Sequence, residues 1–165
     1  MAPINPAFVQ LGYVTNDLTK AMAFFRDSMG APDFHIWKDA DVHMELYGKP
    51  ATAVLTLGFA WSADTMIELI VPISGAVDHY MPGIEGPEFA LKLHHVGAGV
   101  AGTEADFDER LQAAVLAGHG LVNISRAPMG SYCLLDARKT TGLYLEYLWN
   151  NQRGLDFFAN IPRSP

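Results

Sequence analysis

The chain has 165 residues, of which 50% are hydrophobic, and a formal net charge of −7. A chain of this length and hydropathy is expected to bury a sizeable core rather than to be disordered. The negative charge, without a basic run or a basic helix face, argues against nucleic-acid partners and against binding to anionic membranes. No apolar run reaches the roughly 18–20 residues that a membrane-spanning helix needs.

The cysteine content and the N-terminus both favour an intracellular protein. Cys133 is the single cysteine and cannot form a disulfide within the chain, which suits a reducing compartment. The first six residues, Met-Ala-Pro-Ile-Asn-Pro, have neither the charged start nor the apolar core of a signal peptide. We therefore expect the protein to be cytoplasmic.

The first half of the chain predicts one strand, one helix and three further strands. The first strand covers about 7–15, and the helix that follows is capped by Asn16 or Asp17 and ends at Gly30. Pro72 closes the last of the three strand-like runs that come next, at 34–46, 52–59 and 65–71.

The second half repeats this order. A strand at 92–100 leads into a helix that begins after Thr103 and ends at Gly118. Three more strands are predicted at 120–126, 131–137 and 143–149. Both halves therefore run strand–helix–strand–strand–strand.

This order predicts an α+β fold built from two βαβββ modules. Each module forms a curved, mostly antiparallel sheet with one helix on its outer face, and the two modules together make a mixed sheet around a cavity. The predicted domains are a first module at 1–72, a linker at 73–91, a second module at 92–150 and a C-terminal tail at 151–165. Because the tail is apolar, we expect it to pack against other parts of the protein rather than to extend into water. This apolar tail favours a homodimer.

The two halves also match at polar positions of their first strands. The segment 8–18 recurs in residue type at 93–103, and this register aligns Gln10 with His95. Side chains of a strand alternate between its two faces. The bulky neighbours of Gln10 suit packing under the helix, so Gln10 and its counterpart His95 are expected to point into the cavity.

Each half ends in an apolar strand that contains one carboxylate, Glu68 in the first half and Glu146 in the second. A carboxylate inside an apolar strand is costly unless something pairs with it. Strand parity turns both carboxylates into the cavity, where a divalent metal ion would pair with them. The residues predicted to bind one ion in this metal-containing cavity are Gln10, Glu68, His95 and Glu146.

A second pattern suggests a different function. Gly97-Ala-Gly99-Val-Ala-Gly102 matches G-x-G-x-x-G between a strand and a helix, which is where a dinucleotide-binding fold carries this motif. Such a site also needs an acidic residue at the end of the next strand, and 121–125 contains none. Three strands follow the helix instead of a further strand–helix alternation. The dinucleotide hypothesis is therefore disfavoured.

Four segments carry a resemblance to a known family: Gln10 to Met22, Ile67-Glu-Leu-Ile-Val-Pro72, Leu93-His-His-Val-Gly97 and Leu145-Glu-Tyr-Leu148. With the order of elements, the chain resembles the vicinal-oxygen-chelate superfamily over roughly residues 7–150. The resemblance is nearest to glyoxalase I and to methylmalonyl-CoA epimerase-like members. In that family each half supplies two metal ligands, one from its first strand and one from its last. The resemblance implies the same four ligands, a set similar to that of one class of glyoxalase I.

The resemblance also implies a metal-dependent lyase or an isomerase of the epimerase type. A divalent ion, which could be Zn, Ni, Co, Mn or Fe, would hold two neighbouring substrate oxygens while a carboxylate removes a proton from the adjacent carbon. The resemblance makes Glu146 the favoured base and Glu68 its counterpart on the other face of the substrate. Two alternatives stay open: a ring-cleaving dioxygenase, and a non-catalytic small-molecule-binding protein of the resistance type.

Composition bears on the substrate as well. The 11 Lys and Arg residues are scattered through the chain, whereas glutathione or coenzyme A would need a basic cluster. A small, hydrophobic or aromatic carbonyl compound is the expected substrate. The side chains expected to line its site are Phe34, Trp37, Phe59, Trp61, Tyr132 and Tyr144.

Overall fold

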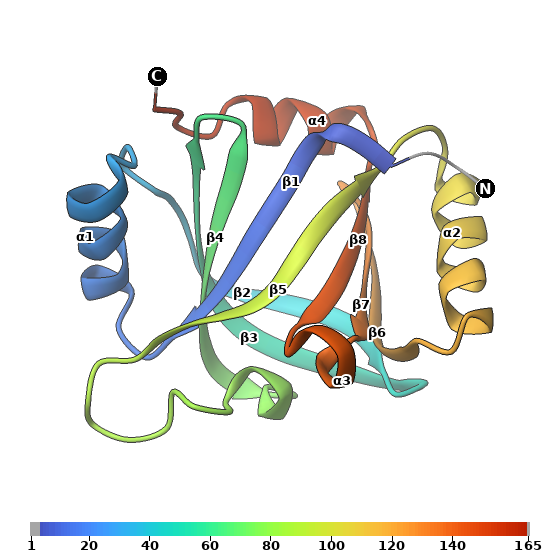
Figure 1. Cartoon of the computed structure of the whole chain (residues 1–165), viewed down its shortest axis with the longest axis horizontal. Helices are drawn as coiled ribbons and strands as arrows, with labels where there is room; N and C mark the ends of the chain where they lie inside the picture. Colours follow the sequence, from blue (N-terminus) through green and yellow to red (C-terminus); the bar gives the residue numbers. More distant parts are fainter. Residues whose placement is uncertain (1–3, 165) are drawn as a thin grey trace. The chain divides into compact units, whose positions relative to one another are not determined.

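A computed structural model describes residues 4–164 (Figure 1). The elements are, in order, β1 (Ile4–Thr15), α1 (Leu18–Met29), β2 (His35–Leu46), β3 (Lys49–Ser62), β4 (Thr65–Gly75), a 3-10 turn η1 (Asp78–Tyr80), β5 (Leu91–Val100), α2 (Glu104–Leu116), β6 (Gly120–Ala127), β7 (Gly130–Asp136), α3 (Arg138–Thr141), β8 (Tyr144–Asn150) and α4 (Gln152–Ala159). The predicted α+β class and the repeated βαβββ order are confirmed. Within the described residues, no helix is long and apolar enough to span a membrane.

Three elements differ from the sequence prediction. Strand β4 continues through Pro72 to Gly75, because Pro72 pairs with Leu55 where the register of β3 shifts, and a proline is tolerated at such an irregularity. The short helix α3 lies between β7 and β8, where only a turn was expected. Part of the tail forms α4. The residues after α4 pair with β3 through an isolated bridge between Arg163 and Trp61.

The chain divides into two compact units that do not follow a single cut in the sequence. The α1 unit comprises 10–42, 52–94 and the residues from Ile161 on. The α2 unit comprises the residues up to Val9, 43–51 and 95–160. The tip of the β2–β3 hairpin belongs to the α2 unit because Glu45 and Leu46 pair with β6. The domain boundaries at 72 and 92 stay a prediction.

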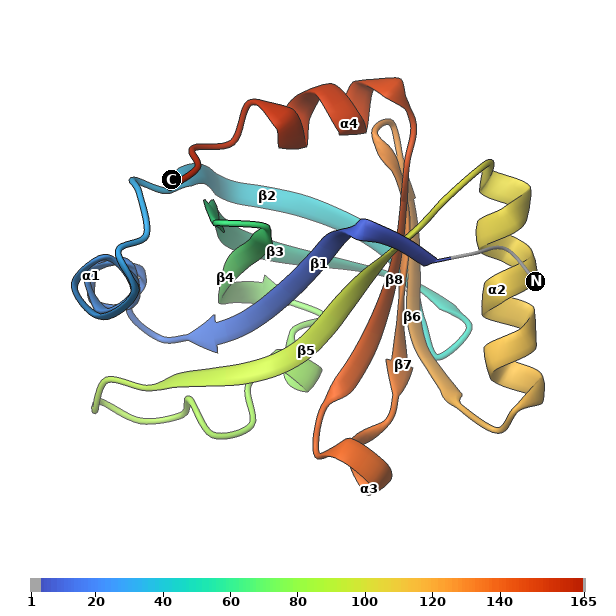
Figure 2. The same cartoon turned by 45° about the horizontal axis from the view of Figure 1, so that its top comes forward.

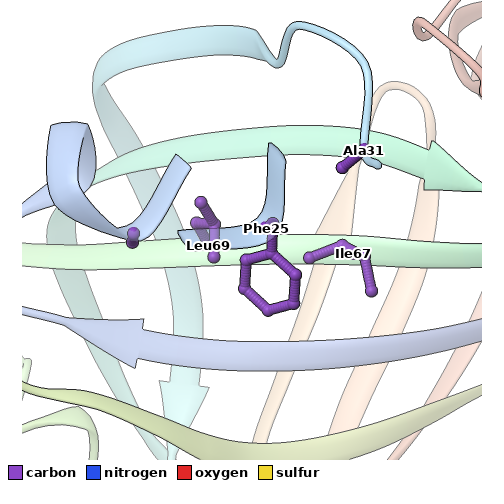
Figure 3. Packing of buried hydrophobic residues seen from close by; sticks show 5 residues of the cluster. Phe25, Ala31, Ile67 and Leu69 are labelled. Atoms are coloured by element: carbon purple, nitrogen blue, oxygen red, sulfur yellow. The ribbon is translucent and has the colours of Figure 1, made fainter. Parts of the chain in front are cut away.

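In the α1 unit, the strands follow the order β1-β4-β3-β2, and α1 packs on one face of them. The Asp17 side chain accepts a hydrogen bond from the backbone N–H of Lys20 at the start of α1, and Gly30 ends the helix in the left-handed conformation. The helix buries Phe25 against Ile67 and Leu69 of β4, as Figure 3 shows.

The same packing settles the parity of β1 and β4. Leu11 and Tyr13 of β1 pack against this core under α1, and the Tyr13 ring meets the Phe25 ring edge-on at 5.0 Å. Because side chains alternate along a strand, Gln10 and Glu68 lie on the opposite face of their strands. The structure therefore places both side chains on the face away from α1, and the cavity predicted there stays a prediction.

A conservative change in this core tests the packing. Ile67 is 0% exposed, so Ile67→Val removes one buried methyl group and is expected to lower the free energy of unfolding by about 1 kcal/mol. Ile36→Val is the matched control, because Ile36 is 47% exposed and its change is expected to stay within about 0.5 kcal/mol. Urea unfolding at equilibrium measures both. Equal losses in the two variants would contradict the packing.

In the α2 unit, the strands follow the order β6-β7-β8-β5. β5 runs parallel to β8, and the remaining pairs of this set are antiparallel. Helix α2 lies against β7 and β8 (Figure 2), and its first turn is fixed by a capping box between Thr103 and Asp106. Phe107 and Cys133 are fully buried in the core beneath it, and burial raises the pKa of the Cys133 thiol to about 12. Cys133 is therefore a core residue.

The glycine pattern after 97 does not form a phosphate-binding loop. Gly97 and Gly99 lie inside β5, where they pair with Glu146 and Leu148 of β8. Gly102 alone lies in the turn before α2, with a φ of 96°. A dinucleotide site needs these glycines in the loop itself, and three strands follow α2. The positions of these glycines also count against the dinucleotide hypothesis.

Candidate functional site

The first pair of predicted ligands meets in the α1 unit. Gln10 of β1 and Glu68 of β4 lie on neighbouring strands, and the Gln10 Nε2 donates a hydrogen bond of 2.9 Å to Glu68 Oε2. Gln10 is 2% exposed, whereas Glu68 is half-buried. An amide ligates a metal through its oxygen. Because the amide nitrogen donates to Glu68, the Gln10 oxygen is the atom that would ligate a metal.

The second pair meets in the α2 unit. Strands β5 and β8 pair in parallel, with Gly97 opposite Glu146. His95 precedes Gly97 by two residues on β5, so its side chain lies on the same face of the sheet as Glu146. The His95 Nε2 lies 3.3 Å from Glu146 Oε2, and the two side chains are only 3% and 8% exposed. Gly97 has no side chain to crowd the carboxylate.

Each pair brings two possible ligands of one divalent ion together. Neighbouring ligands around an ion with bonds of about 2.1 Å lie about 3 Å apart, and His95 Nε2 lies 3.3 Å from Glu146 Oε2. In the first pair, the hydrogen bond places the Gln10 amide beside the Glu68 carboxylate. Imidazole nitrogen, carboxylate oxygen and amide oxygen are all common ligands of such ions. Within residues 4–164, no group of three or more His, Cys, Asp or Glu side chains is arranged to hold a metal. The four-ligand site therefore stays a prediction.

Two predicted aromatic residues share the face of the His95–Glu146 pair. Tyr144 precedes Glu146 by two residues and is buried, while Tyr132 is half-buried on the neighbouring strand β7. Leu134 lies directly opposite Glu146 in the β7–β8 ladder. The carboxylate therefore has an aromatic and aliphatic surrounding.

The other predicted lining residues divide between two faces. Phe59 lies directly opposite Glu68 in the β3–β4 ladder, and Trp61 shares its face; both are buried. Phe34 lies instead on the helix side, where it packs against the α1 core and the position of Gly58. The structure does not bring Phe34 to the Glu68 face. Trp37 is 44% exposed on β2.

His94, the neighbour of His95, takes part in a separate cluster. Its Nε2 lies 3.1 Å from the backbone oxygen of His79, and its ring lies 5.0 Å from that of Tyr80. The His79 ring in turn stacks at 4.0 Å on the Tyr80 ring. This cluster lies where the sequence indicated only a linker. It fixes η1 against the start of β5, close in sequence to His95.

Burial of His79 predicts a loss of stability in acid. Desolvation lowers its pKa from 6.5 to about 4, against the opposing effect of Asp78. Between these values the unfolded chain binds a proton that the folded chain does not, so the free energy of unfolding falls as the pH drops from 6.5 to about 4. The expected loss is roughly 3 kcal/mol, since each pKa unit corresponds to about 1.4 kcal/mol.

Urea unfolding across this pH range measures the effect. His79→Gln is expected to flatten the pH dependence between pH 4 and 6.5, whereas His35→Gln, at an exposed position, is expected to leave it unchanged. An equal pH dependence in the wild type and in His79→Gln would contradict the prediction.

Sequence reasoning missed two residues on or beside the Glu146 face. Asn123 of β6 is fully buried and pairs with Leu134 of β7. Leu134 in turn pairs with Glu146 of β8, so Asn123 lies two strands away from Glu146 in the same row. A polar residue within the apolar run 121–124 is the same signal that identified Glu68, and it would have found Asn123. Arg138 follows β7, and no sequence pattern pointed to it.

No protein-family model and no curated protein matches the sequence. Solved structures do match. Methylmalonyl-CoA epimerase from Mycobacterium tuberculosis aligns with a TM-score of 0.60 at 11% identity, covering 89% of each chain. A Streptomyces coelicolor methylmalonyl-CoA epimerase variant in complex with 2-nitronate-propionyl-CoA aligns with a TM-score of 0.53 at 15% identity, covering 86% of this chain and 94% of that one.

A third match is a variant of 4-hydroxymandelate synthase from Streptomyces coelicolor, with a TM-score of 0.53 at 12% identity. The alignment covers 91% of this chain and 49% of that one. Identities this low establish a common fold and leave the activity to be argued from the site. The chain therefore has the fold of the vicinal-oxygen-chelate superfamily, as the resemblance in its sequence predicts.

Proposed function

We propose that the protein is a divalent-metal-dependent isomerase or lyase, of the epimerase or glyoxalase kind, that moves a proton next to a carbonyl group. The observation that carries the proposal is the buried His95–Glu146 pair on paired strands, with a matching Gln10–Glu68 pair in the other unit. A buried carboxylate facing an imidazole is costly as a purely structural device. Its occurrence at equivalent positions of a repeat favours a ligand role.

The proposed ligands of the ion are Gln10, Glu68, His95 and Glu146. When bound, a divalent ion supplies Lewis-acid stabilisation of the negative charge that develops on a carbonyl oxygen. Glu146 is proposed to accept the proton from the adjacent carbon. Glu68 is proposed to act on the opposite face of the substrate, which an epimerase requires and a one-base isomerase does not.

The surroundings of the two carboxylates support a small substrate with hydrophobic parts. Leu134 and Tyr144 flank Glu146, and Phe59 lies opposite Glu68. Side chains of this kind exclude water, which protects an enolate from side reactions.

The homodimer and the cytoplasmic location also stay predictions. Light scattering of the purified protein tests the homodimer.

Hydrogen exchange with solvent tests the proposed reaction. The metal-loaded protein is incubated in D₂O with methylmalonyl-CoA and with a panel of aliphatic and aromatic α-hydroxy ketones, and ¹H NMR follows the carbon next to the carbonyl. We expect deuterium at this carbon for at least one compound, and no exchange after the metal is removed with a chelator.

Two other results would favour the alternative functions. Oxygen consumption with an aromatic diol, without deuterium exchange, would identify a dioxygenase. Tight binding of a panel compound without exchange or oxygen uptake would identify a binding protein.

A further inference from the structure

The row of side chains next to Glu146 ends in a fixed positive charge. Tyr144 of β8 pairs with His95 of β5 on one side and with Asp136 of β7 on the other. Directly paired residues share a face of the sheet. His95, Tyr144 and Asp136 therefore form one row across three strands, on the face that carries Glu146.

Asp136 holds the Arg138 side chain at the end of this row. The Arg138 Nε lies 2.9 Å from Asp136 Oδ1, and Nη2 lies 2.7 Å from Oδ2, which is a bidentate contact. The guanidinium carbon lies 4.7 Å from the centre of the Tyr144 ring. The contact holds the pKa of Asp136 at about 2, and the pKa of Arg138 above its usual value. The pair therefore stays ionised throughout the physiological range.

Stability alone gives little reason for this arrangement. The Arg138 and Asp136 side chains are 49% and 34% exposed, and exposed ion pairs contribute little to the free energy of folding. The Arg138–Asp136 contact instead fixes the guanidinium above the ring of Tyr144, a residue that is only 5% exposed. A fixed guanidinium on an aromatic ring is well suited to binding a planar anion.

Part of the guanidinium stays available to such a group. Asp136 engages Nε and Nη2, whereas Nη1 has no hydrogen-bond partner among residues 4–164. Lys139 follows directly on α3, which Figure 1 shows at the turn between β7 and β8, and adds a second positive charge. Together Asp136, Arg138 and Lys139 carry net positive charge. This is notable in a chain whose net charge is −7.

We propose that Arg138 binds an anionic group of the substrate, a carboxylate or a phosphate, and so sets substrate specificity. The proposal rests on the function proposed above, because it places the reacting carbon at Glu146. Tyr144 and Glu146 are two residues apart on β8, about 7 Å along the strand. The anionic group is therefore separated from the reacting carbon by several bonds. A carboxylate bonded directly to that carbon is too close to reach Arg138.

A pair of metal-chelating probes tests this specificity. Hexanohydroxamate and adipate monohydroxamate present the same hydroxamate and the same carbon chain, and differ in a terminal carboxylate. We expect the carboxylate to tighten binding to the metal-loaded wild type by about tenfold, the scale of one charge-assisted hydrogen bond. Arg138→Gln is expected to abolish this advantage and to leave hexanohydroxamate binding as in the wild type. Calorimetry measures both affinities.

Arg126 supplies a matched control. Its guanidinium is also half-exposed, paired with carboxylates and placed over a ring, but it bonds Glu104 and Asp108 on the α2 side of the sheet. Arg126→Gln should therefore keep the advantage of the charged probe. An advantage that persists in Arg138→Gln, or that is lost equally in Arg126→Gln, would overturn the proposal.

A second measurement separates this proposal from the metal site. If neither hydroxamate binds the metal-treated protein, the proposed function fails, and titration with inorganic phosphate and with acetate then decides on Arg138 alone. We expect either anion to shift the ¹⁵N NMR signal of the Arg138 Nε–H saturably in the wild type, and more than that of Arg126. An unchanged Arg138 signal would overturn the anion site.

Discussion

We expect Glu146→Gln to lower turnover by about 10²–10⁴ while the protein keeps much of its metal. This range is the usual contribution of a general base. The amide of Gln retains an oxygen that can ligate, but it has no basicity near neutral pH. Glu146→Gln therefore distinguishes the role of this side chain as a metal ligand from its role as a base. The buried position next to Leu134 and Tyr144 accepts a Gln of almost the same shape.

Metal content by mass spectrometry and deuterium exchange of the substrate measure the two roles. Glu68→Gln tests the symmetry of the site: a smaller loss points to one base, and a comparable loss points to two bases on opposite faces of the substrate. Glu88→Gln is the inert control, because Glu88 is exposed in the segment between β4 and β5. Full exchange activity in Glu146→Gln would refute the assignment of the base.

Strand parity explains why much of this arrangement could be predicted. Once Leu11 and Ile67 are recognised as the residues that pack under α1, the two-residue period of a strand fixes the opposite face for Gln10 and Glu68. The same reasoning separates His95 from His94. Periodic patterns in elements of ten or more residues leave little freedom.

The features that were missed lie where no such period exists. The sequence pattern predicts a strand from residue 34, but β2 begins at His35, and Phe34 in the preceding loop packs under α1. Helix α3 has only four residues and depends on local contacts, among them the Thr141 hydroxyl bond to the Ala137 oxygen and the left-handed Gly142. The burial of His79 depends on contacts with β5, which are distant in sequence.

The repeat itself was the most productive signal for the site. Gln10 alone would have been taken as a structural residue, and its alignment with His95 promoted it to a candidate ligand. The structure supports the pairing within each half, since Gln10 contacts Glu68 and His95 contacts Glu146. Which ion these residues bind depends on geometry and on metal availability, and a sequence pattern carries neither.

We expect His95→Ala to abolish stoichiometric metal binding. The change removes the single imidazole from the proposed ligand set and leaves two carboxylates and an amide. Loss of an outer-shell partner already costs about 10–100-fold in metal affinity, and loss of a ligand is expected to cost more. The measurement is the metal-to-protein ratio after dialysis against trace metal, for each of Zn, Ni, Co, Mn and Fe.

His94→Ala is the matched control for this experiment. It removes an imidazole from the adjacent position of the same strand, but one that contacts the His79 backbone oxygen rather than Glu146. We expect this variant to bind metal like the wild type, although the loss of a buried contact lowers its stability. Circular dichroism confirms that both variants are folded before their metal content is compared.

Thermal unfolding supplies an independent test, because an ion that binds only the folded state raises its stability. The gain is about 4 kcal/mol when the ion concentration is a thousand times the dissociation constant. The wild type and His94→Ala are therefore expected to melt at a higher temperature with metal than without, whereas His95→Ala melts at the same temperature in both conditions. A metal-dependent rise in His95→Ala equal to that of the wild type would place the ion elsewhere, and the two buried pairs would then have to be explained as structural contacts.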